Sequence, residues 1–362
     1  MAMRLLFTVS DHGYGHATRT VALLREALSR EHSLAVRIVS GPRAGEFLAR
    51  SFRGEPRVGV GIRPSDPGLL LSPESLRVDP AQTTEAWGAW MDSWEEWIEA
   101  EQVQAARTGL PDAVLSDGTP PALILAARLG VPGLLLGNFA WSDILARLLP
   151  AGMLSRIRDA LALATVSLAY PFALPFEGLP RPEALPLVAR RPGRSRDDVR
   201  RSLGVDPAEP LVFLSSGLSS DPRLLWDLAP RLRARALVAS HAPELPGAVR
   251  IPAGDTEGQD YIGASDLIVG KVGYGTLSEA LVAGVPMIMV RVEGTPEVAA
   301  LEAGMIEAGA GVGCDPSGDI LTAARQWLRD GARTGRPYRA EDCAGAAKIT
   351  LEKVRSLARR RA

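Results

Sequence analysis

Short apolar runs alternate along this chain with longer segments whose apolar residues recur every three or four positions. In the first half, this pattern predicts strands over residues 4–10, 33–40, 112–117 and 131–137, and helices over 17–30 and 120–130. Strands that alternate with helices in this way indicate a parallel sheet with helices on both faces.

The alternation stops between Tyr170 and Gly193, where prolines are frequent and no periodicity is visible. It then resumes, with strands predicted over 209–216, 235–240, 265–270 and 285–291. We therefore predict an α/β protein with two Rossmann-like, doubly wound domains, 1–188 and 189–340. Residues 341–362 are predicted to form a helix that either crosses back to the first domain or lies on the surface. Ligands of such open sheets bind at the carboxyl ends of the strands, here in a cleft between the domains.

The composition is that of an ordinary globular protein and suits two domains: 362 residues, 46% hydrophobic and 23% charged. The net charge of −1 argues against nucleic acid as a partner. Two cysteines without CxxC spacing predict a reducing compartment and no structural metal. No signal peptide and no apolar run of membrane-spanning length is recognisable, so we predict a cytoplasmic protein without a transmembrane segment. The oligomeric state is left open.

The first motif that suggests chemistry is "SDHGYGHATRT", residues 10–20. Gly13 and Gly15 follow a strand and precede a helix, where they permit a tight turn that exposes backbone N–H groups. His16 then stands at the start of the helix and faces the cleft, or it caps its own helix. The dinucleotide fingerprint GxGxxG fails here, because position 18 is Thr.

The second motif covers residues 263–290, "GASDLIVGKVGYGTLSEALVAGVPMIMV". A strand is followed by a glycine-rich turn with Lys271 and Gly273, and a helix is predicted to open at Thr276. The N-terminus of such a helix suits a diphosphate. Glu279 lies one turn into the helix, where its carboxylate either accepts hydrogen bonds from ribose hydroxyls or forms a capping box with Thr276.

This second motif resembles the donor-binding motif of GT-B glycosyltransferases, a class that includes UDP-glycosyltransferases and MurG. An ordered set of motifs is similar to the glycosyltransferase-like N-terminal portion of plant-type L-arabinokinases. The matching segments are His12–Arg19, Ser116–Pro121, Asn138–Trp141, Pro186–Arg191 and Gly270–Leu281. The sugar-kinase domain of arabinokinases has no counterpart in these residues.

The resemblance implies a GT-B fold with an N-terminal acceptor-binding domain and a C-terminal donor-binding domain. It implies metal-independent, inverting transfer of a sugar from a nucleotide diphosphate-sugar, foremost a UDP-sugar, to a hydroxyl or amine. His16 is the expected general base, and Asp117 the residue that orients its imidazole, unless Asp117 caps a helix at Thr119. His12 and Asp11 are alternative bases.

The expected donor contacts, mostly implied by the resemblance, are Gly15, Arg190, Ser216, Gly217, Lys271, Gly273, Tyr274, Gly275, Thr276, Glu279 and Glu297. Arg190 together with the helix N-terminus would neutralise the diphosphate, so that no metal is needed. The expected acceptor contacts are His12, Asn138 and Trp141. Trp87, Trp90, Trp94 and Trp97 form a stripe at helical spacing, which indicates core packing in preference to an acceptor wall.

Two other functions fit the same residues. A nucleotide-sugar hydrolase or epimerase would use the same fold, and product analysis without an acceptor separates it from a transferase. A non-catalytic nucleotide-sugar-binding module is the third reading. Retaining transfer is disfavoured because position 287, eight residues after Glu279, is Met.

Overall fold

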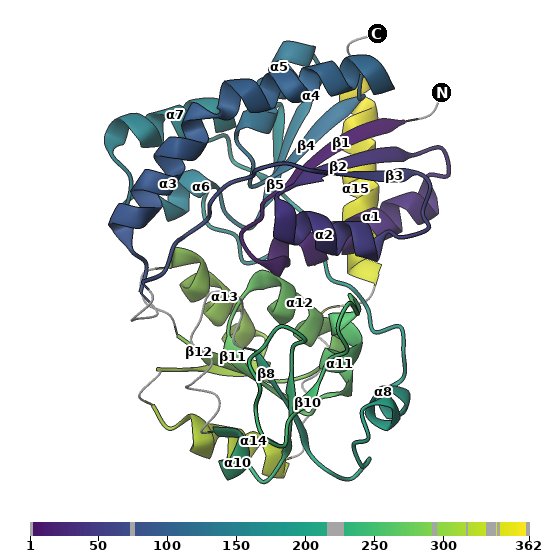
Figure 1. Cartoon of the computed structure of the whole chain (residues 1–362), viewed down its shortest axis with the longest axis vertical. Coiled ribbons are helices and arrows are strands. Elements are labelled where there is room, and N and C mark those ends of the chain that lie inside the picture. The colour runs from purple at the N-terminus through teal and green to yellow at the C-terminus, as the bar shows by residue number, and fades with distance from the viewer. Residues whose placement is uncertain are drawn as a thin grey trace. The chain divides into compact units, whose positions relative to one another are not determined.

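The computed structural model describes residues 3–72, 77–215, 228–291, 295–315, 318–330, 338 and 341–359, and it divides into two compact units (Figure 1). Unit 1 comprises Met1–Leu70, Val78–Val188 and Glu341–Ala362, and unit 2 comprises Leu71–Arg77 and Ala189–Ala340. Each unit is built on its own parallel sheet. The α/β fold class predicted from the sequence is therefore confirmed.

The described part of unit 1 alternates strands and helices from its first residues. Its strands are β1 (Arg4–Val9), β2 (Ala35–Ser40), β3 (Val58–Ile62), β4 (Ala113–Asp117), β5 (Gly133–Gly137), β6 (Val166–Ala169) and β7 (Glu183–Ala184). Its helices are α1 (Tyr14–Arg30), α2 (Pro42–Ser51), α3 (Pro80–Asp92), α4 (Trp94–Thr108), α5 (Pro121–Leu129), α6 (Trp141–Ile144), α7 (Ala151–Leu161) and α15 (Glu341–Arg359).

The strand order of this sheet is β3-β2-β1-β4-β5-β6-β7, so the order reverses between β1 and β4. These two strands pair in parallel, with Val9 opposite Asp117 at their carboxyl ends. Such a reversal is where open α/β sheets bind ligands, because the loops on either side diverge. The segments after β1 and β4 therefore meet at one point of the sheet edge.

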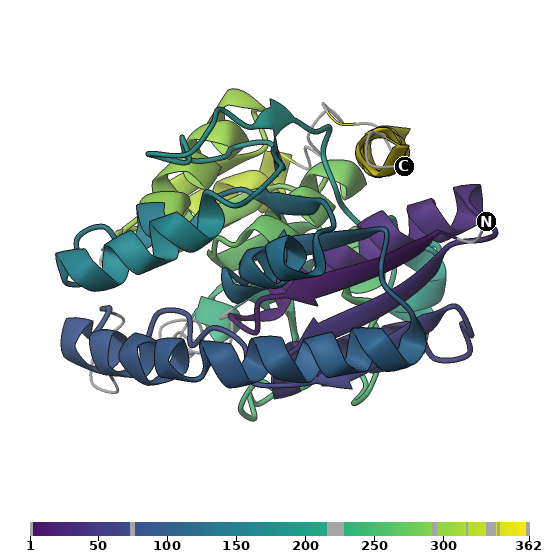
Figure 2. The same ribbon diagram turned by 90° about the horizontal axis from the view of Figure 1, so that it is seen from above.

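Helices cover both faces of the unit 1 sheet, as Figure 2 shows for α4 on one side and α15 on the other. Side chains of α4 and α5 pack on β1, β2 and β4. Helix α15 packs beside α1, and Arg355 on α15 forms an ion pair with Glu31. Although α15 comes last in the chain, it belongs to the same unit as the first strand.

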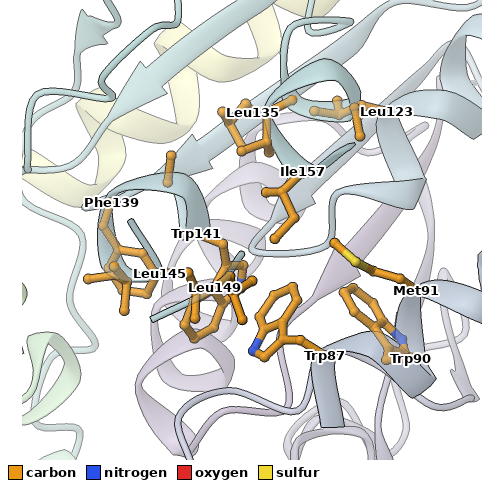
Figure 3. Close-up of a cluster of buried hydrophobic side chains, with 14 of the residues drawn as sticks. Trp87, Trp90, Met91, Leu123, Leu135, Phe139, Trp141, Leu145, Leu149 and Ile157 are labelled. Atoms are coloured by element: carbon orange, nitrogen blue, oxygen red, sulfur yellow. The ribbon is translucent and has the colours of Figure 1, made fainter. Parts of the chain in front are cut away.

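The tryptophan stripe lies in the core, but on two helices instead of the single one predicted. The helix breaks at Ser93, between α3 and α4. Trp87, Trp90 and Trp94 join Trp141 in one buried cluster, and the rings of Trp87 and Trp141 meet edge to face at 5.2 Å (Figure 3). The alternative that this stripe forms an acceptor wall is wrong, since all four indoles are enclosed by protein.

Unit 2 repeats the same architecture on a second sheet, in the order β10-β9-β8-β11-β12-β13. Its strands are β8 (Leu211–Ser215), β9 (Arg235–Val238), β10 (Val249–Arg250), β11 (Leu267–Lys271), β12 (Met287–Val290) and β13 (Gly311–Cys314). Its helices are α8 (Arg196–Ser202), α10 (Leu228–Arg231), α11 (Gly258–Ala264), α12 (Tyr274–Ala283), α13 (Pro296–Glu307) and α14 (Ile320–Asp330).

One type of helix-to-strand connection occurs in both units. Helices α5 and α12 each end at a left-handed glycine, Gly130 and Gly284, with φ of 61° and 69°. A Val-Pro pair and a buried strand follow in both cases. Glycine adopts this conformation without a Cβ clash, and the proline two residues later cannot continue a helix. The turn from helix to strand is thus specified by local sequence.

Candidate functional site

The histidine loop, residues 10–13, connects β1 to α1 in unit 1. Gly13 caps α1 with a φ of 77°, and its position leaves open space where a side chain would be. Gly15 and His16, predicted on the glycine turn and at the helix start, lie within the first turn of α1. The alternative that His16 caps its own helix is wrong, because α1 has no side-chain cap.

His16 and Asp117 meet at the carboxyl ends of β1 and β4. Their closest atoms, Nδ1 of His16 and Oδ1 of Asp117, are 2.8 Å apart, and the two residues are 4% and 0% exposed. Helix α5 begins at Pro121 without a side-chain cap, so the alternative that Asp117 caps a helix at Thr119 is also wrong. A carboxylate in contact with one ring nitrogen favours the proton on that nitrogen and leaves the other as a base.

Arg19 completes this centre and was given no role in the sequence analysis, although it lies within the first motif. Its Nε donates to Asp117 Oδ2 at 2.6 Å, its Nη1 donates to Asn138 Oδ1 at 2.6 Å, and its Nη2 lies 2.7 Å from His16 Nδ1. The guanidinium is 2% exposed and lies over the ring of Tyr170. The three-residue spacing from His16 puts both side chains on one face of α1, which is the signal that identifies Arg19.

The charge of Asp117 follows from these contacts. Burial alone would raise the pKa of its carboxyl, but the nearby Arg19 and His16 outweigh this effect and lower the pKa to about 2. Asp117 is therefore ionised at neutral pH. The Arg19 guanidinium balances the charge of this buried carboxylate.

The residues predicted to contact an acceptor have different surroundings. Asn138, directly after β5, is fully buried and binds Arg19 through its Oδ1. Trp141 is 1% exposed, and its Nε1 donates to the Gly118 carbonyl at 2.9 Å. Trp141 has no open ring face on which an acceptor could stack, and the Asn138 oxygen is bound by Arg19, so both support the site from within. His12 is partly exposed, and its ring lies 5.6 Å from that of Trp141.

Asp11, proposed above as a substitute base, has a structural role. Its Oδ1 accepts a hydrogen bond of 2.6 Å from the backbone N–H of Ala44, in the first turn of α2. A carboxylate in this position satisfies an N–H that has no acceptor within the helix. This contact holds Asp11 at the start of α2, and its use as an alternative base stays a prediction.

The second motif forms a strand–turn–helix unit within unit 2. Helix α12 begins at Tyr274 with Gly273 as its N-cap, two residues before the predicted start at Thr276. Gly275 and Thr276 thus lie in the first helical turn, where backbone N–H groups point along the axis toward an anion. Because Thr276 is inside the helix, the predicted capping box with Glu279 does not form.

Glu279 is instead paired with Arg190. The Arg190 Nε donates to Glu279 Oε1 at 2.6 Å, a second guanidinium nitrogen donates to the Thr256 carbonyl, and both side chains are 4% exposed. Burial raises the pKa of Glu279, and the Arg190 charge opposes this shift. The sequence identified both residues but not their contact across 89 positions.

Four further predicted donor contacts remain: Lys271, Glu297, Ser216 and Gly217. Burial lowers the pKa of Lys271 at the end of β11, and the charge of Glu297, in the first turn of α13, opposes that shift. Ser216 and Gly217 fall outside the described residues. No group of three or more His, Cys, Asp or Glu side chains within the described ranges is arranged to hold a metal ion. Among the same residues, no helix is both long and apolar enough to span a bilayer.

Comparison with solved structures identifies the class of fold. The glycosyltransferase SsfS6 of Streptomyces sp. SF2575 matches with a TM-score of 0.56 and 21% identity, covering 98% of this chain and 96% of that one. The structure of Phytolacca americana UGT2, complexed with UDP-2fluoro-glucose and pterostilbene, matches with a TM-score of 0.60 and 16% identity, covering 99% and 94%. The chain has the GT-B fold of nucleotide-sugar glycosyltransferases, as the sequence motifs predicted.

Sequence comparison adds two distant homologues, while no protein-family model matches. L-arabinokinase of Arabidopsis thaliana is 30% identical over 293 residues, 79% of this chain. An N-acetylglucosamine transferase of Thermus thermophilus that acts on N-acetylmuramyl-(pentapeptide) pyrophosphoryl-undecaprenol is 29% identical over 191 residues, 49% of this chain. The chain spans 28% of the length of the first homologue, and its match covers 53% of the second.

Proposed function

We propose that this protein is an inverting glycosyltransferase that needs no metal and moves a sugar from a nucleotide diphosphate-sugar to a hydroxyl or amine. The buried His16–Asp117 contact, 2.8 Å long at the point where the strand order reverses, is the observation that carries the proposal. A UDP-sugar is the proposed donor, since two solved structures of this fold hold UDP-2fluoro-glucose and UDP.

In the proposed reaction, His16 Nε2 takes the proton of the acceptor hydroxyl as the oxygen attacks the anomeric carbon. The bond from that carbon to the diphosphate breaks, and the nucleotide diphosphate leaves. In the reactive tautomer, Nδ1 carries the proton and donates to Asp117. Arg19 then donates through Nε and Nη2 to the carboxylate of Asp117, and not to Nδ1, and holds that carboxylate in place. His12 lies beside this centre and is the proposed acceptor contact.

Unit 2 supplies the proposed donor site. The first turn of α12, with Gly275 and Thr276, would receive the diphosphate, and the Glu279 carboxylate would accept hydrogen bonds from the ribose. Because Arg190 holds Glu279 in this structure, we assign Arg190 to positioning Glu279 as well as to balancing charge near the diphosphate.

The donor site is tested first, by melting temperature with UDP, TDP, GDP, ADP and CMP. A ligand at a hundredfold excess over its Kd stabilises the native state by about 3 kcal/mol. We expect one nucleoside diphosphate to raise the melting temperature, Glu279→Gln to abolish the rise, and the exposed-site control Glu307→Gln to keep it. A rise that Glu279→Gln leaves unchanged would place the nucleotide elsewhere.

The base is tested with the donor so identified and a panel of hydroxyl acceptors. His16→Ala should lower kcat by about a thousandfold, because a positioned base contributes to the chemical step and not to nucleotide binding. His32→Ala, at an exposed turn, is the control. Equal loss of turnover and nucleotide affinity contradicts the base assignment. Release of free sugar without an acceptor would indicate a hydrolase.

A further inference from the structure

Asp66 is a buried acid beneath the histidine loop that the proposed reaction does not use. It is 3% exposed and lies in the segment that follows β3. Its Oδ1 accepts a hydrogen bond from Ser10 Oγ at 2.9 Å, and its Oδ2 accepts one from Ser65 Oγ at 3.0 Å. Within the described chain, these side-chain partners are neutral hydroxyls, so no cation balances the carboxyl through a hydrogen bond.

The Ser10 hydroxyl connects Asp66 to His12. Ser10 is fully buried directly after β1, and its Oγ accepts a hydrogen bond of 3.1 Å from the backbone N–H of His12. A hydroxyl has one proton and two lone pairs. Because the Ser10 hydroxyl donates its hydrogen bond to Asp66, a lone pair of Ser10 Oγ accepts the hydrogen bond from the His12 N–H.

The same segment also fixes the His12 side chain. Gly68 has a φ of 68°, and a Cβ at this position would lie 1.9 Å from His12 Nδ1, so only glycine fits against the imidazole. The Gly68 carbonyl in turn accepts a hydrogen bond of 2.9 Å from Trp87 Nε1 in the core. His12 is therefore held at its amide through Ser10 and at its ring by Gly68 and Trp141.

Burial disfavours the ionised form of the Asp66 carboxyl. Burial raises the pKa of its carboxyl to about 7, with a smaller contribution from the charge of Asp11, against the lowering effect of the two serines. An asparagine of the same shape would accept the Ser10 hydrogen bond without desolvating a charge. The hydrogen bond from Ser10 therefore depends on an acceptor oxygen at position 66 and not on its charge.

We propose that Asp66 is a positioning residue: through the Ser10 hydroxyl, it fixes the backbone of His12 where the acceptor binds. This inference rests on the proposed function in taking His12 as an acceptor contact. Asp66 itself touches neither substrate nor reacting atoms.

The test uses the full chain labelled with ¹⁵N-histidine, which has four histidines and so gives four backbone amide signals. The signal that His12→Gln removes is the one to follow, and that of His32 is the internal control. Hydrogen exchange of the His12 amide is measured in Asp66→Ala, Asp66→Asn, Ser10→Ala and Ser65→Ala. Ser65 contacts the same carboxyl but lies outside the connection to His12.

We expect exchange of the His12 amide to quicken about tenfold in Asp66→Ala and Ser10→Ala, the effect of losing one hydrogen bond. Ser65→Ala should leave the rate unchanged. Asp66→Asn should keep the wild-type exchange rate of the His12 amide, because the amide oxygen of asparagine still accepts from Ser10. Equal rates in Asp66→Ala and Ser65→Ala overturn the proposal. If Asp66→Ala does not fold, an unchanged rate in Ser10→Ala overturns it.

A kinetic measurement then separates this inference from the proposed function. Asp66→Ala should raise KM for the acceptor and leave the nucleotide-induced rise in melting temperature as in the wild type. If the amide responds as expected but no sugar transfer is found with any acceptor, Asp66 positions His12 and the transferase assignment fails. If transfer is found and KM is unchanged, the role of Asp66 toward the acceptor is refuted.

Discussion

The charge balance around Asp117 makes its replacement by asparagine the most informative perturbation of unit 1. Asparagine keeps the shape of the side chain and removes its charge. The Arg19 guanidinium, 2% exposed, would then lose the negative charge of its carboxylate partner and be left with neutral amide oxygens, such as that of Asn138, as acceptors. We therefore expect a loss of stability far larger than at an exposed ion pair.

Two estimates give the size of this loss of stability. Moving a carboxyl pKa from 3.8 to about 2 on folding corresponds to roughly 2 kcal/mol. Removing one partner of a buried ion pair costs about 3 to 5 kcal/mol, because the other charge stays desolvated. Since the folded-state pKa lies below the unfolded one, this stabilisation is complete above about pH 4. It disappears as the pH falls through about 2.

Urea denaturation followed by tryptophan fluorescence is the assay. Trp87, Trp90, Trp94, Trp97 and Trp141 all belong to unit 1, so the signal reports mainly on that unit. We expect Asp117→Asn to lower the free energy of unfolding by about 3 kcal/mol, equally at pH 6 and pH 8. The control is Glu95→Gln, which breaks an exposed ion pair with Arg128 in the same unit and should leave the midpoint unchanged.

A double variant, Asp117→Asn with Arg19→Met, measures the interaction energy between Asp117 and Arg19. Because the double variant no longer buries an uncompensated charge, it should be more stable than Asp117→Asn alone. A loss below about 1 kcal/mol in Asp117→Asn, or additive effects in the double variant, would refute the account of a buried, mutually dependent pair.

Two further predictions concern the segment under the histidine loop. The pKa of Asp66 is about 7 in the folded protein against an ordinary 3.8, so the folded state binds this proton more tightly, and stability should fall as the pH rises from about 4 to 7. Asp66→Asn should remove this fall, about 4 kcal/mol in total and about 3 kcal/mol of it between pH 5 and pH 8, where urea denaturation measures it; an identical pH slope in the variant contradicts the assignment. Gly68→Ala should destabilise unit 1 more than Gly54→Ala does, because both glycines have positive φ but only Gly68 abuts another side chain, that of His12; equal losses in urea denaturation would show that backbone strain alone accounts for the effect.

Much of the fold was predictable because its determinants are local. Apolar periodicity located strands β1, β2, β4, β5 and β11, and the glycines that follow β1 and β11 marked the turns before α1 and α12. The pairing of His16 with Asp117 was implied by the resemblance to GT-B glycosyltransferases, and the structure places both at the carboxyl ends of neighbouring strands. Local patterns predicted helix boundaries less accurately. Helix α12 begins two residues before the predicted start, and the helix predicted to carry the tryptophan stripe breaks at Ser93.

The sequence by itself determined the order of strands and helices and the chemical groups at the strand ends, because periodicity and turn residues act over a few neighbouring positions. Only the tertiary structure decided the partners of those groups. Arg19 reaches Asn138 across 119 positions, and Asp66 reaches Ser10 across 56. Such contacts depend on which segments pack together and exclude water. The charge state of a buried acid follows from its neighbours in space and not from its neighbours in the chain.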